Sequence, residues 1–393
     1  MIATVHSVNP SPRANVVSQL ILGISPGPGQ PADLESFFHS IAQELNYLAA
    51  GVAGVTAAGY PEPQIVRTFV IQFTTDRPAG DELINAIVEN SESPGRFRIF
   101  FSVRHKLRKY YPPYEPDDPP PSKRRRFDVM GSTTPRRSSA SKAARVCNAE
   151  DARMAEKSKA AINSLAQEEG FKGYSIFFCP SPEDKARRPA LKCLWGLGPS
   201  LVPYDTMHLF LCDVVLRLWK LLAGENAKLG DEQPWVIPQT VRDTIGREIK
   251  AGRKTVPLRQ PCSLRNNAKY SGSKNAVDWL YFLPCTGEVV LADRIPEEIV
   301  KMFMLLFRAG RLVFKPVLIT NAEVREAEKL IKRFCLAFYA HVYAGKEERL
   351  RVCRPTTVAL LDVTDNLRSC GPARSFGKFP AERLLGALSR LIR

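Results

Sequence analysis

The sequence lacks several features that would place it in a familiar class of protein. It has no run of about 18 or more apolar residues, so no membrane-spanning helix is expected. Its first residues, MIATVHSVNPSPR, have no basic start followed by an apolar core, which argues against a secretory signal. The nine cysteines are odd in number and include no CxxC pair, so we expect free thiols rather than a disulfide scaffold or a compact zinc module. The glycine-rich PGPGQP at 26–31 lacks the Lys-Ser/Thr that a nucleotide-binding loop requires.

Positive charge, by contrast, is abundant and concentrated in one place. The net charge is +16, which favours a polyanionic partner because Lys and Arg release counterions from nucleic acid on binding. Residues 104–145 hold twelve Lys or Arg against four acidic residues, and this excess of +8 is half of the total. The stretch is rich in Pro and Ser, so we expect residues 104–150 to form an exposed linker.

The linker carries the candidate nucleic-acid contacts. KRRR at 123–126 is typical of a nuclear-localisation or DNA-contacting patch, and a solubilising charge run is an equally good reading of the same residues. The side chains that we assign to nucleic-acid binding are Lys123, Arg124, Arg125, Arg126, Arg136 and Arg137.

Hydrophobic periodicity predicts a chain that is α/β near its start and mainly α later. Apolar residues at helical spacing predict a helix of about five turns after Asp33. The runs that begin at Val66 and Arg96 have the composition of buried strands. Thr320 and Glu323 form a capping-box pattern. Beyond residue 150 we expect helices at roughly 150–169, 205–223, 238–251, 296–309, 320–344, 356–367 and 380–392.

Several stretches, in the same order along nearly the whole chain, resemble the CACTA (En/Spm-like) DNA transposases of plants and fungi. The stretches that carry the resemblance are ILGISPGPGQPADLESFFHSIAQEL, FVIQFTTDRPAGDELI, NSESPGRFRI, the Tyr- and Pro-rich loop before RRRFD, and GYSIFFCPSP. They continue with LVPYDTMHLFLCDVVLRLWKLLAGE and with CGPARSFGKFPAER near the end. DTMHL followed much later by CGP and FPAER is the most specific part of the match.

The resemblance implies a DDE-type transposase on an RNase H-like fold, cutting and joining DNA at transposon ends. Such an enzyme uses carboxylates to hold two divalent cations, and Mg²⁺ suits oxygen ligands. Carried over by motif, Asp76 matches the second acid, Asp205 and His208 match a D-x-x-H motif, and Glu382 is the candidate for the final acid. The metal ligands expected on this basis are Asp76 and Glu382.

The sequence also departs from the family pattern. The first catalytic acid has no counterpart in this sequence, so we expect a chain that does not cleave DNA by itself. Where the family has cysteines that would bind zinc, this sequence has Gly95 and Arg98. Where the family has two histidines, it has Val358 and Asp362. The resulting expectation is an incomplete RNase H-like core with a large helical insertion, divided into residues 1–103, the linker 104–150 and a mostly helical region 151–393.

Each candidate residue also has an ordinary structural explanation. Asp76 precedes Pro78 and would suit a turn, and Asp205 would suit the N-cap of a helix. His208 would suit a hydrogen-bonded core position, and Glu382 the first turn of a helix. Two functions from different classes therefore stay open. One is a catalytically incomplete nuclear protein derived from a cut-and-paste DNA transposase. Its ancestral partner is DNA at transposon ends, its cofactor would be Mg²⁺ if it were active, and an oligomer is an open option. The other is a non-catalytic basic DNA-binding or interaction protein, domesticated or a relic.

Overall fold

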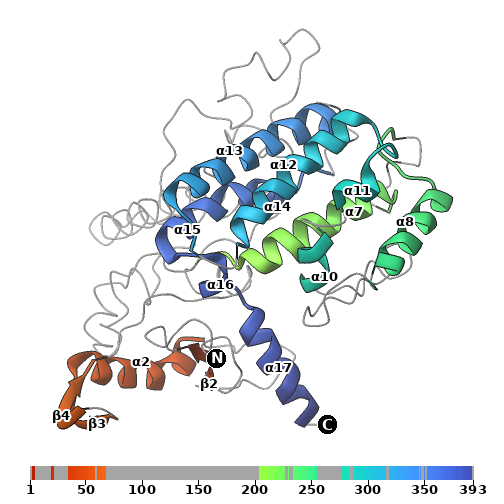
Figure 1. Cartoon of the computed structure of the whole chain (residues 1–393). Coiled ribbons are helices and arrows are strands. Elements are labelled where there is room, and N and C mark those ends of the chain that lie inside the picture. The colour runs from red at the N-terminus through yellow and green to blue at the C-terminus, as the bar shows by residue number, and fades with distance from the viewer. Residues whose placement is uncertain are drawn as a thin grey trace, which may run out of the picture. The chain divides into compact units, whose positions relative to one another are not determined.

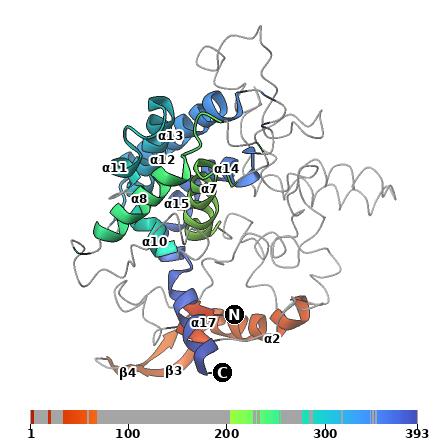
Figure 2. The same ribbon diagram turned by 90° about the vertical axis from the view of Figure 1, so that its right-hand side faces the viewer.

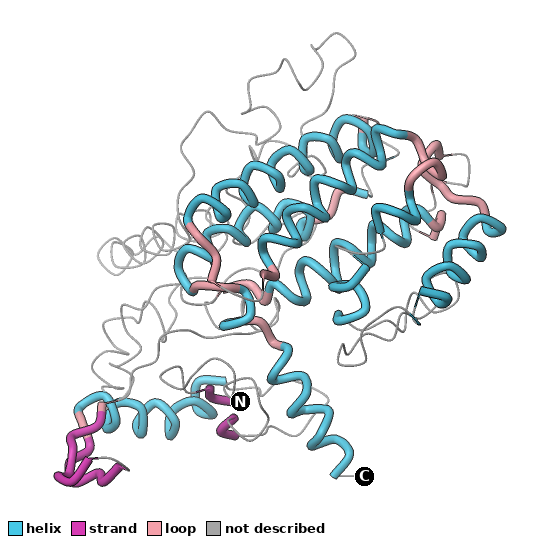
Figure 3. Tube along the Cα trace, in the orientation of Figure 1, coloured by secondary structure: helices cyan, strands magenta, loops and turns pink. Residues whose placement is uncertain are grey.

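The computed structural model describes residues 2–4, 19–21, 34–57, 60–67, 203–225, 229, 233–252, 254, 276–282, 287–315, 318–344, 346, 349 and 352–391. These residues are mostly helical, with two small antiparallel strand pairs (Figure 3). The chain divides into two compact units. The N-terminal unit contains the described residues up to 203 together with 377–391, and the helical unit contains those of 204–376. None of the described helices combines the length and hydrophobicity that crossing a bilayer requires.

The N-terminal unit pairs short strands and carries two longer helices. Its elements are β1 (Ile2–Thr4), β2 (Gln19–Ile21), α2 (Leu34–Ala50), β3 (Val52–Ala57), β4 (Tyr60–Val66) and α17 (Phe379–Leu391) (Figure 1). β1 pairs with β2 and β3 with β4, both antiparallel. Gly51 has a φ of 111°, a left-handed conformation that suits glycine where the chain leaves α2 for β3.

The helical unit begins with a π-helix that continues as an α-helix. Its elements are η5 (Met207–Val215), α7 (Leu216–Leu222), α8 (Gln239–Gly252), α10 (Ala276–Tyr281), α11 (Gly287–Leu291), α12 (Glu297–Val313), α13 (Asn321–Phe338), η9 (Tyr339–Tyr343), α14 (Pro355–Ala359), η11 (Leu360–Asp362), α15 (Val363–Cys370) and α16 (Ala373–Phe376). α12 and α13 pack side by side and stay adjacent in both ribbon views (Figures 1 and 2). α10 and α14 pack on η5, and α15 packs on α13.

Aromatic rings join these helices into one core. Trp219 of α7 lies 5.8 Å from Phe282, which follows α10, and the two rings meet edge to face. Phe282 in turn meets Phe307 of α12 at 5.9 Å, and Phe307 lies 5.9 Å from Phe303 on the same helix. Rings in this geometry gain about 0.5–1.5 kcal/mol per pair beyond the area they bury. The chain of rings therefore fixes α7 and α12 around the short helix α10.

The start of α13 is fixed by the capping box predicted from the sequence. The Glu323 backbone N–H donates to Thr320 Oγ1 at 3.2 Å, and the Thr320 N–H donates to Glu323 Oε2 at 2.8 Å. Lys315, just after α12, donates to Glu323 Oε1 at 2.7 Å. One carboxylate thus joins the end of α12 to the beginning of α13.

These contacts make the stability of the helical unit depend on pH. The hydrogen bond from Lys315, followed by that from the Thr320 backbone, lowers the pKa of Glu323 from 4.5 to about 2. The pKa of Glu323 is lower in the folded protein than in the unfolded chain. The contribution of its carboxylate to the unfolding free energy is therefore complete above pH 4.5 and is lost as the pH falls through 2. We expect Glu323→Gln to lower the unfolding free energy at neutral pH, with a difference from wild type that shrinks across this window. Urea denaturation at a series of pH values measures it, with Glu326→Gln on the same helix as the control for charge loss. A difference that stays constant down to pH 2 would contradict the assignment.

The sequence-based expectation of a mainly helical later chain is confirmed for the described residues. Five expected helices correspond to η5–α7, α8, α12, α13–η9 and α17, and the expected 356–367 helix is divided among α14, η11 and α15. The expected 150–169 helix, the strand expected from Arg96, the linker 104–150 and the boundaries drawn at 103 and 150 lie outside the described residues. The strand expected from Val66 also lies outside them, apart from Val66, which ends β4, and Arg67.

Candidate functional site

The first candidate site lies where the chain enters η5. The Asp205 carbonyl accepts the first helical hydrogen bond, from the Leu209 N–H at 3.0 Å. Its carboxylate Oδ1 accepts from the Met207 N–H at 3.1 Å, and this is the geometry of an N-cap. The Asp205 side chain is only 1% exposed, so its carboxylate is almost entirely removed from water. The N-cap function that the sequence left open for Asp205 is therefore present.

The second carboxylate oxygen of Asp205 contacts His208. Oδ2 lies within hydrogen-bond distance of His208 Nδ1, and the histidine side chain is 35% exposed. With Asp205 as the acceptor, Nδ1 is the ring nitrogen assigned the proton in this contact, and Nε2 is the second ring nitrogen. The expected D-x-x-H proximity is thus observed, and the pair consists of a buried acid and a half-exposed imidazole.

The backbone that carries the Asp205–His208 pair is surrounded by buried side chains. Tyr204, Thr206 and Met207 are all buried, and Phe210 packs edge to face against Phe314 at 5.5 Å. The backbone of η5 is π-helical over nine residues, a conformation that is rare and often found at functional sites. We infer that the side chain of His208 is presented by a fixed backbone rather than by a loop.

A histidine held in this way can perform proton transfer. The buried carboxylate selects one tautomer, orients the ring and stabilises the imidazolium when Nε2 takes up a proton. Neutral Nε2 can accept a proton, and the protonated ring can donate a hydrogen bond to a phosphate oxygen. Asp205 acts in both cases through His208, as a positioning residue.

The same pair does not fit a magnesium ion. Mg²⁺ prefers oxygen ligands in octahedral geometry, whereas both oxygens of Asp205 are already hydrogen-bonded and His208 offers nitrogen. Within the described part of the chain, no three His, Cys, Asp or Glu side chains are grouped so that they could hold a metal. The pair is therefore better suited to hydrogen bonding and proton transfer than to holding Mg²⁺.

Of the other site residues assigned from the sequence, the structure describes Glu382 alone. Glu382 lies in the first turn of α17, as expected, where it is exposed and its N–H donates to the Lys378 carbonyl at 2.9 Å. It belongs to the N-terminal unit, whereas Asp205 and His208 belong to the helical unit. Asp76 and the linker residues Lys123, Arg124, Arg125, Arg126, Arg136 and Arg137 lie outside the described residues.

The described cysteines have the properties of structural thiols. Among the described residues, Cys212, Cys335, Cys353 and Cys370 form no disulfide. Burial raises the pKa of Cys335 to about 12 and that of Cys370 to about 11, and it also raises the pKa of Cys353 well above its usual value. Since the thiolate is the reactive form, these three side chains do not suit nucleophilic catalysis at neutral pH.

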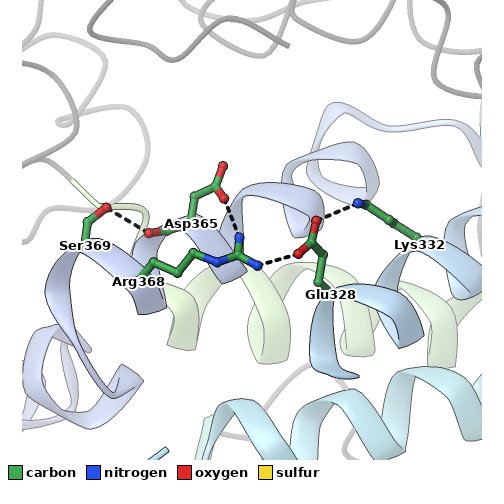
Figure 4. A network of polar contacts seen from close by, with 5 residues as sticks. All are labelled: Glu328, Lys332, Asp365, Arg368 and Ser369. Carbon is green, nitrogen blue, oxygen red and sulfur yellow. Dashed lines mark hydrogen bonds and ion pairs between the residues drawn. The ribbon is translucent and has the colours of Figure 1, made fainter. Parts of the chain in front are cut away.

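A polar network between α13 and α15 was not predicted from the sequence. Arg368 bonds to Glu328 of α13 and, at 2.8 Å, to Asp365 on its own helix, while Lys332 bonds to Glu328 at 2.5 Å (Figure 4). Burial pushes the pKa of Glu328 upward, but the hydrogen bonds from Lys332 and Arg368 outweigh it and the pKa is lowered. The i, i+4 spacing of Glu328 and Lys332 was visible in the sequence, whereas their contact with Arg368 is tertiary. We regard the network as a structural tie between the two helices.

No protein-family model matches the chain, and the searches among curated proteins and solved structures likewise gave no match.

Proposed function

We propose that this protein is derived from a cut-and-paste DNA transposase, acts on DNA in the nucleus, and uses the Asp205–His208 pair at its DNA-binding site. The observation that carries the proposal is the contact between the two members of the D-x-x-H motif. A spacing of three residues permits that contact but does not require a buried acid beneath a half-exposed imidazole. The RNase H-like ancestry, with Asp76 and Glu382 as ligands of Mg²⁺, is part of the same proposal and rests on the sequence resemblance.

In the proposed function, His208 contacts the DNA and Asp205 positions it. A phosphodiester is anionic, and a protonated imidazole is a good donor to its oxygens. The buried carboxylate of Asp205 stabilises the protonated ring in this contact.

The experiment is a selection from a random-sequence duplex pool with the full chain as bait. We expect one sequence to be enriched, because a transposase-derived protein recognises the ends of its element. We expect His208→Ala to weaken binding to the enriched duplex by about 10–100-fold, the effect of losing one charge-assisted hydrogen bond of about 1.5–3 kcal/mol. His341→Ala, which removes an exposed histidine of η9, is the matched control. A pool that shows no enrichment, or equal effects of the two substitutions, would remove the basis of the proposal.

The second candidate is a non-catalytic basic protein that binds DNA or another partner without reading sequence. The charge of residues 104–145, +8, favours it. Such a protein would bind duplexes of any sequence with a steep dependence on salt, and the binding would depend on Lys123 to Arg126 rather than on His208. Enrichment of one sequence in the selection separates the first candidate from this one.

A further inference from the structure

The solvent-facing side of α13 carries a row of basic side chains. Arg325, Lys329 and Arg333 are all exposed and follow one another at i, i+4 and i+8. At 1.5 Å per residue, their Cα atoms span about 12 Å along the helix. The opposite side of α13 faces the core and consists of Val324, Ala327, Leu330, Ile331, Phe334, Cys335 and Phe338, all buried. The three cations, called the α13 row below, are therefore held outward on a helix that is fixed from behind.

In the part of the chain that the structure describes, other cations near α13 form ion pairs with acids, but those of the α13 row do not. Lys332 and Arg368 bond to Glu328, and Lys315 bonds to Glu323. Within the described residues, Arg325, Lys329 and Arg333 take part in no ion pair. Glu326 is exposed on the same helix and offsets one charge, which leaves a net charge of +2 on this face.

Unmatched charges in this arrangement do not serve the stability of the helix. Like charges at i, i+4 destabilise a helix by about 0.2–0.5 kcal/mol per pair, and the α13 row contains two such pairs. A face needed only for solubility would be served by mixed charges, such as the Glu328–Lys332 ion pair on the same helix. A row of one sign is instead complementary to a polyanion.

We propose that the α13 row binds the phosphate backbone of DNA. One strand of a duplex presents a phosphate about every 3.4 Å along the axis, so a 12 Å row faces about three to four phosphates. Arg and Lys have long side chains and bind phosphate oxygens without reading bases, so the surface positions the protein on DNA and does not select a sequence. The choice of DNA as the polyanion rests on the proposed function. The existence of the row, and the absence of ion pairs to it among the described residues, are independent of that function.

The test compares salt dependence of binding in the full chain. The variant Arg325→Gln, Lys329→Gln, Arg333→Gln removes the row, and Gln keeps the helix propensity high. The control variant Arg247→Gln, Lys250→Gln, Arg308→Gln removes the same charge from exposed positions on α8 and α12. The probe is one random-sequence DNA duplex of about 20 base pairs, titrated between about 50 and 200 mM salt. Circular dichroism checks that each variant keeps its helices.

We expect the row variant to reduce the slope of log K against log salt by about 3, roughly one unit for each phosphate contact. The control variant should leave the slope close to that of wild type. Equal slopes for wild type and row variant, or equal losses in both variants, would overturn the proposal. It would also be overturned if the row variant bound DNA normally but lost affinity for vesicles containing phosphatidylserine, since the row would then serve a membrane surface.

The same assay separates the contribution of the linker to DNA binding from that of the α13 row. An alanine variant of Lys123 to Arg126 should lower the slope independently of the row variant, so the combined variant should show the sum of the two losses. Because the probe has no selected sequence, this result does not depend on whether a specific duplex is enriched by the protein. Failure of the row and failure of the proposed transposase ancestry are thus distinguishable.

Discussion

Replacing Phe307 with alanine is expected to lower the unfolding free energy of the helical unit by about 3–5 kcal/mol, the usual range for a fully buried phenylalanine. The side chain is 1% exposed, and it meets Phe282 and Phe303 with ring centroids 5.9 Å away in both cases. On another side it faces Gly287 of α11, where a Cβ atom would lie only 2.5 Å from Phe307 Cε2. The ring is therefore enclosed by Phe282, by Gly287 of α11 and by Phe303 of its own helix, and its removal would leave an internal cavity.

Urea denaturation followed by tryptophan fluorescence would measure this loss, because Trp219 and Trp279 are buried in the same aromatic cluster. Val289→Ala is the matched control, since this residue of α11 is 74% exposed and its truncation should change stability by less than about 0.5 kcal/mol. A Phe307→Ala protein as stable as the control would mean that the cluster around α10 does not support the unit.

The helices were predictable wherever a long element buries one side. α12 and α13 repeat apolar residues over 17 and 18 residues, and this is long enough for the periodicity to be unambiguous. The short helices α10 and α11, with 6 and 5 residues, were missed because they complete fewer than two turns. Their positions depend instead on tertiary contacts, such as that of Gly287 with Phe307.

The hairpin of β3 and β4 was missed for a different reason. Pro61 and Pro63 lie in β4, and proline inside a strand pattern argues against a central strand. The observed pair has register shifts between Val52 and Val55 and again before Ala57. Such irregularity permits prolines in a two-stranded pair, whereas local propensity alone does not anticipate it.

The candidate site was predictable in part. A separation of three residues brings Asp205 and His208 together on any helix, so their contact followed from the sequence. The burial of Asp205 did not, because it depends on how the folded chain packs around the start of η5. The α13 row was visible in principle as Arg325, Lys329 and Arg333 at i, i+4 and i+8, but its lack of acidic partners is a property of the folded chain.

Asp205 offers a way to separate the stability of η5 from the chemistry of His208. Asp205→Ala removes both the acceptor for the Met207 N–H and the partner of Nδ1 in a buried place, so we expect a loss of about 2–3 kcal/mol in unfolding free energy. Asp205→Asn keeps an acceptor for Met207 and should cost less than about 1 kcal/mol. Urea denaturation of the two variants measures the difference, and equal losses would show that the cap at Oδ1 contributes little.

The asparagine variant has a second consequence that a purely structural residue would not produce. Its amide nitrogen donates where the carboxylate accepted, so His208 Nδ1 must become the acceptor and the proton moves to Nε2. We expect ¹⁵N NMR of the imidazole to report this exchange of tautomers in a folded protein. In the proposed function the protonated ring donates to a phosphate oxygen, and the asparagine no longer stabilises the imidazolium, so the variant should bind the enriched duplex more weakly while keeping the fold. If the variant binds as tightly as wild type, the charge that Asp205 stabilises on His208 has no part in recognition, and the carboxylate serves only to cap the helix and orient the ring.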